Sequence, residues 1–86
     1  MEINTHKHYE KMWVKLGRNQ QLQVLNALKL FMSDQNNPKL RIHQLKGNYY
    51  PQYSLSAGGD LRIHFLKLNE TSIVLMLVGT HAQLYR

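Results

Sequence analysis

The chain has 86 residues, no cysteine and a formal net charge of +6. Its length predicts a single domain over residues 1–86, and the lack of thiols excludes disulfides, thiolate nucleophiles and cysteine-ligated zinc. A basic surface attracts nucleic acids, acidic proteins or anionic membranes. No apolar run approaches the roughly 20 residues of a spanning helix, so we expect a soluble cytoplasmic protein without a membrane partner.

The first residues predict a short strand followed by a helix. Residues 2–4 are extended in character, and apolar side chains then recur at the spacing of one helical face. These side chains are Tyr9, Met12, Trp13 and Leu16. Thr5 can cap this helix and Gly17 can end it. We expect the face to belong to the core.

A second amphipathic helix is predicted from Asn19 until Asn36-Asn37-Pro38 stops it. Its apolar stripe consists of Leu22, Leu25, Leu28 and Met32, and is widened by Val24 and Phe31. We expect this stripe in the core as well, because aliphatic side chains at helical spacing are typical of a packed face.

The second half changes to a period of two and predicts three strands, over residues 49–56, 61–68 and 72–78. Gly58-Gly59-Asp60 and Asn69-Glu70 are the turns between them. The last strand is apolar from residue 73 to 78, which is typical of a central strand covered on both faces. The predicted fold class is α+β, with a short N-terminal strand and a helical hairpin packed on an antiparallel sheet of three consecutive C-terminal strands. The other side of the sheet would remain free for a binding site.

Alternation along the middle strand places Asp60, Arg62 and His64 on one face. Cleavage of RNA without a metal requires a base for the 2′-hydroxyl, an acid for the leaving 5′-oxygen and a cation on the phosphate. Imidazole, carboxylate and guanidinium can fill these roles. The same side chains would equally suit a face that is simply solvated.

The remaining histidines differ in their settings. His43 lies in a basic, loop-like segment and His81 follows the last strand, which are places where rigid scaffolds present functional groups. His6 and His8 form an H-x-H pair without a further ligand nearby, so we read them as surface residues and expect no metal site. Three tyrosines beside Lys46 could stack on unpaired bases or pack into the sheet: Tyr49, Tyr50 and Tyr53.

Segments of the second half resemble the RelE/ParE toxin superfamily. They are LRIHQLKG at residues 40–47, YSL at residues 53–55, GGDLRI at residues 58–63 and GTHAQLY at residues 79–85. The last segment is most similar to the YafQ branch. Their order and spacing cover residues 40–85, and the two helices expected before them fit the same fold.

The resemblance implies the toxin of a type II toxin–antitoxin system. Such a toxin enters the ribosomal A site, cleaves the bound messenger RNA by metal-free acid–base chemistry without a cofactor, and is neutralised by a cognate antitoxin protein. Contact with operator DNA is implied only indirectly, through the antitoxin.

The resemblance assigns catalytic roles to His43, Asp60, Arg62, His81 and Tyr85. The two histidines would transfer protons and Arg62 would bind the phosphate. Asp60 would orient a histidine or act as a base, and Tyr85 would hold the substrate. Substrate binding is further expected of four side chains, Lys39, Arg41, Lys46 and His64.

The chain departs from the YafQ pattern at Ser56, where that branch has a further histidine. His64 could replace this missing proton-transfer group. Two alternatives stay open. One is a ParE-like inhibitor of DNA gyrase, although such members generally lack this set of histidines. The other is a catalytically inactive basic module that binds nucleic acid or an antitoxin.

Overall fold

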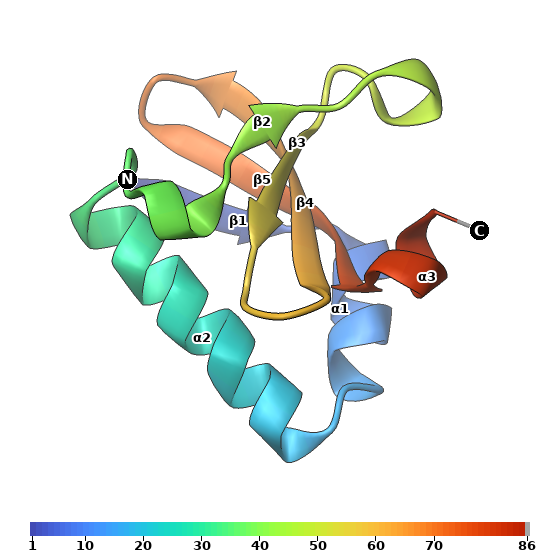
Figure 1. Cartoon of the computed structure of the whole chain (residues 1–86). Coiled ribbons are helices and arrows are strands. Elements are labelled where there is room, and N and C mark those ends of the chain that lie inside the picture. The colour runs from blue at the N-terminus through green and yellow to red at the C-terminus, as the bar shows by residue number, and fades with distance from the viewer. Residues whose placement is uncertain (86) are drawn as a thin grey trace.

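The computed structural model describes residues 1–85, so Arg86, the last residue of the predicted domain, lies outside it. One sheet has the strand order β1-β5-β4-β3-β2. The strands are β1 (Glu2–Thr5), β2 (His43–Gln44), β3 (Tyr53–Ser56), β4 (Leu61–Asn69) and β5 (Ser72–Thr80). The helices are α1 (Lys7–Val14), α2 (Arg18–Ser33) and α3 (His81–Leu84), with 3₁₀ turns η1 (Pro38–Leu40) and η2 (Gly47–Tyr49). Figure 1 shows α1 and α2 meeting at a sharp corner and α3 leaving the end of β5.

The structure confirms the α+β class, the N-terminal strand and the three consecutive antiparallel strands. The sheet as a whole is mixed, because β1 pairs in parallel with β5, with Ile3 opposite Ile73. β5 is therefore an internal strand, flanked by β1 and β4. This position accounts for its continuous apolar run.

A change of register divides β5 into two halves. Phe65 lies opposite Leu75, whereas the preceding residue, His64, lies opposite Leu77. One step along β4 therefore corresponds to two steps along β5, and Met76 is the extra residue of a β-bulge. As a result Leu75 and Val78, which are three residues apart, are both buried in the core.

Two strand predictions need correction. The strand expected from residue 49 begins only at Tyr53, because residues 47–49 form a 3₁₀ turn in which the Tyr50 amide donates to the Gly47 carbonyl (3.1 Å). Pro51, which follows, has no amide hydrogen for a ladder. The segment around His43, read as a loop, forms the short edge strand β2, with His43 opposite Ser54.

The helix boundaries also differ from the prediction. His6 and not Thr5 caps α1, since its Nδ1 accepts from the His8 amide (3.1 Å). Gly17 does not end α1 but precedes α2, where Gln20 accepts from its amide (3.1 Å). No helix in residues 1–85 is long and apolar enough to cross a membrane.

The core lies between the helices and the inner face of the sheet. From α2 it takes Val24, Ala27 and Phe31, and the Phe31 ring lies 5.5 Å from that of Phe65. The predicted stripe is right for half of its members, since Val24 and Phe31 are buried and Leu28 packs against the core. It is wrong for the other three, which are about half exposed: Leu22 at 51%, Leu25 at 51% and Met32 at 55%. From α1, Tyr9 is buried and Met12 and Trp13 pack around the core, and so does Leu16 just after the helix, as predicted.

Candidate functional site

A row of polar side chains crosses the outer face of the sheet, which is the face opposite the core. Strand pairing sets His43 opposite Ser54, and Ser54 opposite His64. The next pair along β3 and β4 is Ser56 with Arg62. Because residues two apart on a strand share a face, these five side chains belong to one surface.

Two tyrosines cover the centre of this row. The ring of Tyr49, from η2, lies 4.8 Å from that of His64, edge on, and the ring of Tyr85 lies 5.3 Å away. The Tyr85 hydroxyl is 2.8 Å from His64 Nε2, and the Tyr49 hydroxyl donates to the Leu84 carbonyl. The outer face is therefore not left free as predicted, because η2 and α3 close over its middle.

His64 is completely buried beneath these rings. Desolvation lowers its pKa from 6.5 to about 4, and the nearby His43 acts in the same direction. The imidazole is therefore neutral at neutral pH. Its predicted direct contact with substrate does not fit this burial, since Tyr49 and Tyr85 occupy the space above it.

His81 is the first residue of α3, whose start is capped by Thr80. Its ring lies 4.6 Å from that of Tyr85. The His81 amide donates to the Asp60 carbonyl (3.0 Å), so the β3–β4 turn and the start of α3 are joined. Both His81 and Asp60 are exposed, and Tyr85 is 38% exposed, so all three can be reached from solvent.

The orientation of His43 defines which of its nitrogens can act. Nδ1 lies 2.9 Å from the Arg41 carbonyl oxygen. A carbonyl can only accept, so we assign the proton of the neutral ring to Nδ1. Nε2 then carries the lone pair of an exposed imidazole, which is the arrangement that a general base requires.

Arg62 forms hydrogen bonds with the turn that precedes its own strand, β4. Its Nη1 donates to the carbonyls of Gly59 (2.8 Å) and Leu61 (3.1 Å) and, at 3.4 Å, to the Ser56 hydroxyl. Burial raises the pKa of Tyr85, while a hydrogen bond from Ser54 and the charge of Arg62 oppose this rise. The guanidinium is thus close enough to act on the phenol electrostatically.

The structure thus gathers six residues named from the sequence: His43, Asp60, Arg62, His64, His81 and Tyr85. The other three lie differently. Lys39 lines a groove against α2. Arg41 has a positive φ of 49° and serves His43 through its carbonyl. Lys46 precedes η2 and is exposed.

The prediction passed over Ser54 and the covering role of Tyr49. Ser54 alternates with Ser56, so the period of two along β3 could have placed it on the polar face. Tyr49 was noted only as a possible partner for bases. Nothing in its spacing indicates a contact with α3, which follows 32 residues later in the chain.

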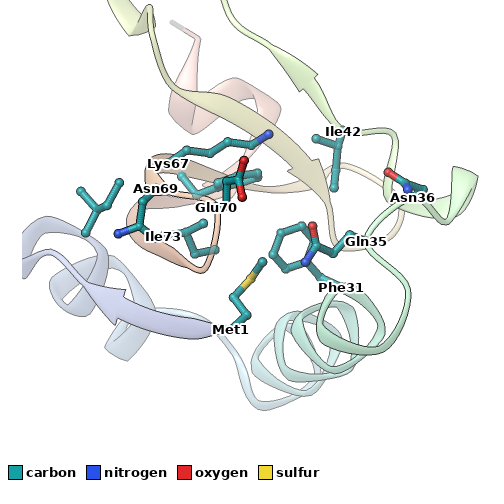
Figure 2. A pocket seen from close by; sticks show the side chains of 11 residues that line it. Met1, Phe31, Gln35, Asn36, Ile42, Lys67, Asn69, Glu70 and Ile73 are labelled. Atoms are coloured by element: carbon teal, nitrogen blue, oxygen red, sulfur yellow. The ribbon is translucent and has the colours of Figure 1, made fainter.

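A hollow of about 460 Å³ lies at the far end of the sheet. Figure 2 shows Phe31, Ile73 and Met1 around it, and none of the predicted site residues lines it. Within residues 1–85, no three metal-ligating side chains gather at one point. The polar outer face is therefore the stronger candidate for chemistry.

No family model matches the chain, and no curated protein sequence matches it. Solved structures do match. The fold is that of RelE-like toxins of toxin–antitoxin systems.

Among these structures is YafQ of Escherichia coli, with a TM-score of 0.78, 17% identity and coverage of 99% of this chain and 98% of that one. A chain of the E. coli DinJ–YafQ toxin–antitoxin complex gives 0.76 at 20% identity, covering 99% and 97%. The archaeal RelE–RelB complex of Pyrococcus horikoshii gives 0.70 at 15%, covering 95% and 96%. At these identities the likeness establishes the fold.

Proposed function

We propose that this chain is the toxin of a type II toxin–antitoxin pair and cleaves messenger RNA in the ribosomal A site without a metal. The observation that carries the proposal is a row of polar side chains across the outer face of a toxin fold, with His43 and His81 both exposed. Strand pairing sets His43 opposite Ser54 and Ser54 opposite His64, His64 meets the Tyr85 hydroxyl, and the Tyr85 ring lies against that of His81.

The two outer histidines would transfer the protons. Nε2 of His43 takes the proton of the 2′-hydroxyl, and the 2′-oxygen attacks the phosphorus. The bond from phosphorus to the 5′-oxygen breaks as His81 protonates that oxygen. The products are a 2′,3′-cyclic phosphate and a free 5′-hydroxyl, and each histidine ends in the opposite protonation state.

The phosphate would lie between these histidines, near Arg62 and Tyr85. The guanidinium supplies positive charge where the phosphoryl oxygens gain negative charge, and the phenol supplies a hydrogen bond. Asp60, whose backbone carbonyl accepts from the His81 amide, would orient this histidine. Lys39, Arg41 and Lys46 would attract the RNA backbone from the rim.

A cognate antitoxin would neutralise the chain, as the complexes DinJ–YafQ and RelE–RelB suggest by their names. With a net charge of +6, the chain suits an acidic segment of such a partner. Operator DNA would be reached only through the antitoxin. A target on the ribosome would place the protein in the cytoplasm.

The proposal is tested by induced expression in bacteria with primer extension on an abundant message. The strains would carry the wild type, His81→Ala, or the matched control His8→Ala, which replaces an exposed histidine of α1. Breaks within translated regions are expected for wild type and control but not for His81→Ala.

Intact message in all three strains would overturn the proposal. If the wild type then still arrests growth, DNA-damage signalling would point to gyrase as the target, and its absence would point to a module that only binds.

A further inference from the structure

The buried centre of the polar face holds an imidazole that the reaction above does not use. His64 has no exposed surface, and only one of its two ring nitrogens has a partner. Nε2 meets the Tyr85 hydroxyl at 2.8 Å, while Nδ1 is buried and finds no hydrogen-bond partner in residues 1–85. This asymmetry decides how the Tyr85 hydroxyl is oriented.

A doubly protonated ring would place a positive charge and an unpaired N–H group in a completely buried site. The titratable side chains that contact the ring or act on its pKa are Tyr49, Tyr85 and His43, and no carboxylate is among them. The ring therefore carries a single proton.

That proton can sit on either nitrogen. On Nδ1 it would be a buried donor without an acceptor, an arrangement that folded proteins rarely tolerate. On Nε2 it is donated to the Tyr85 oxygen, and only a bare lone pair is left unpaired. The second arrangement costs less.

We infer that His64 is a positioning residue that donates from Nε2 to the Tyr85 hydroxyl, so that the phenolic proton of Tyr85 points out of the cluster. Tyr85 is the reachable member of the pair, at 38% exposed. Its ring also lies 4.6 Å from the ring of His81, a histidine assigned to catalysis in the proposed function. The value of this orientation for cleavage rests on the function proposed above, whereas the hydrogen bond does not.

A second anchor acts on the same segment. Tyr49 packs edge on against both His64 and Tyr85, and its hydroxyl binds the carbonyl of Leu84, the residue before Tyr85. The backbone and the side-chain tip of the Tyr85 region are thus held at separate points. The hydroxyl hydrogen can still rotate about the C–O bond, and a donor from His64 excludes the direction that points back to the buried ring.

The hydrogen bond is tested first on the wild-type protein by NMR with ¹⁵N-labelled histidine. At neutral pH we expect His64 to show a protonated Nε2 and a bare Nδ1. A proton on Nδ1, or on both nitrogens, would overturn the inference. This measurement needs neither RNA nor a variant.

Two substitutions then test the role. His64→Leu removes the donor, and we expect kcat for cleavage to fall roughly tenfold with KM unchanged, as for the loss of one hydrogen bond. His64→Gln keeps an N–H group near the same place and should recover part of that loss. In a Tyr85→Phe background, His64→Leu should cause no further loss, because the two side chains act as a unit.

Equal and independent losses from the two substitutions would mean that His64 only supports the fold, and would overturn the inference. The readouts also separate it from the proposed function. A wild type that leaves message intact but shows the Nε2 proton on His64 would overturn the RNase and support the positioning of Tyr85.

Discussion

The buried imidazole of His64 should make the stability of the protein depend on pH. Its pKa is about 4 in the folded chain and 6.5 when solvated, so between these values the unfolded chain binds the proton and the folded chain does not. Stability therefore rises with pH across this window and falls on acidification. By pH 4 the free energy of unfolding should have dropped by about 3 kcal/mol.

Urea denaturation at a series of pH values between 4 and 7 checks this prediction. In His64→Leu the slope over this window should be much weaker than in the wild type. A wild-type stability that rises on acidification would contradict the assignment of a neutral buried ring.

His43 and His64 should also be coupled through space. The charge of His43 adds to desolvation in lowering the pKa of His64. In His43→Ala the pKa of His64 should rise, while staying below 6.5 because the burial remains. Histidine NMR titration measures the change, with His8→Ala as the control that should leave His64 unaffected.

At the scale of elements, α2 shows that periodicity alone does not predict which face of a helix is buried when two faces carry apolar residues. The row Val24, Ala27 and Phe31 fits helical spacing as well as the row Leu22, Leu25 and Met32 does, and the predicted stripe took members from both. The structure buries the first row and exposes the second. Spacing alone does not separate the two rows, because the position of the sheet decides which face of α2 is covered.

Two neighbouring residues of α2 should therefore differ sharply on truncation. Phe31→Ala removes a buried ring that packs on Phe65 and should cost about 3–5 kcal/mol of unfolding free energy. Met32→Ala lies on the exposed side and should change it by roughly 0.5 kcal/mol or less. Thermal or urea unfolding of the two variants measures these changes. Similar losses of unfolding free energy in both would contradict the assignment of Phe31 to the core.

The start of α3 offers a second test. A Cβ on Gly79 would lie 2.7 Å from Oε1 of Gln83, which accepts from the Thr80 amide (2.8 Å) in the cap of α3. Gly79→Ala should thus break this cap, cost about 1 kcal/mol and displace His81. Because small displacements at a reacting group are costly, cleavage should fall on the order of tenfold or more.

Gly17→Ala is the matched control, since a Cβ there meets Gln20 only at 3.8 Å. Gln20 forms the same kind of cap, and α2 carries none of the site residues. Full cleavage by Gly79→Ala would show that α3 tolerates the loss of its cap.

The site could be predicted from sequence only in part, for reasons visible at single residues. The alternation along β4 placed Arg62 and His64 on one face, and the motif GTH marked His81. Burial of His64 could not be foreseen, because it depends on Tyr49 and Tyr85 arriving from elements distant in sequence. The N-terminal strand was predicted, but its parallel partner, β5, lies about 70 residues away and leaves no local signal.

For the whole molecule, the pairing of β1 with β5 protects an apolar edge. The amides of Glu2 and His6 donate to carbonyls of this strand pair, and alternation gives the same role to the amide of Asn4, so Asn4→Pro should remove a donor from the ladder and loosen β1, exposing the edge of β5. We expect a lower melting temperature and association of the chain. Size-exclusion chromatography with light scattering tests this, and exposed Asn4→Ala should remain as the wild type.

The same internal position of β5 sets an order of events during synthesis. On a growing chain, β1 to β4 leave the ribosome before β5, so the strand that joins the first to the rest is made last among the strands. His81 and Tyr85 follow it. If the protein cuts messages on ribosomes, the ribosome that makes a copy is therefore exposed to that copy only after β5 and the residues that follow it have been translated.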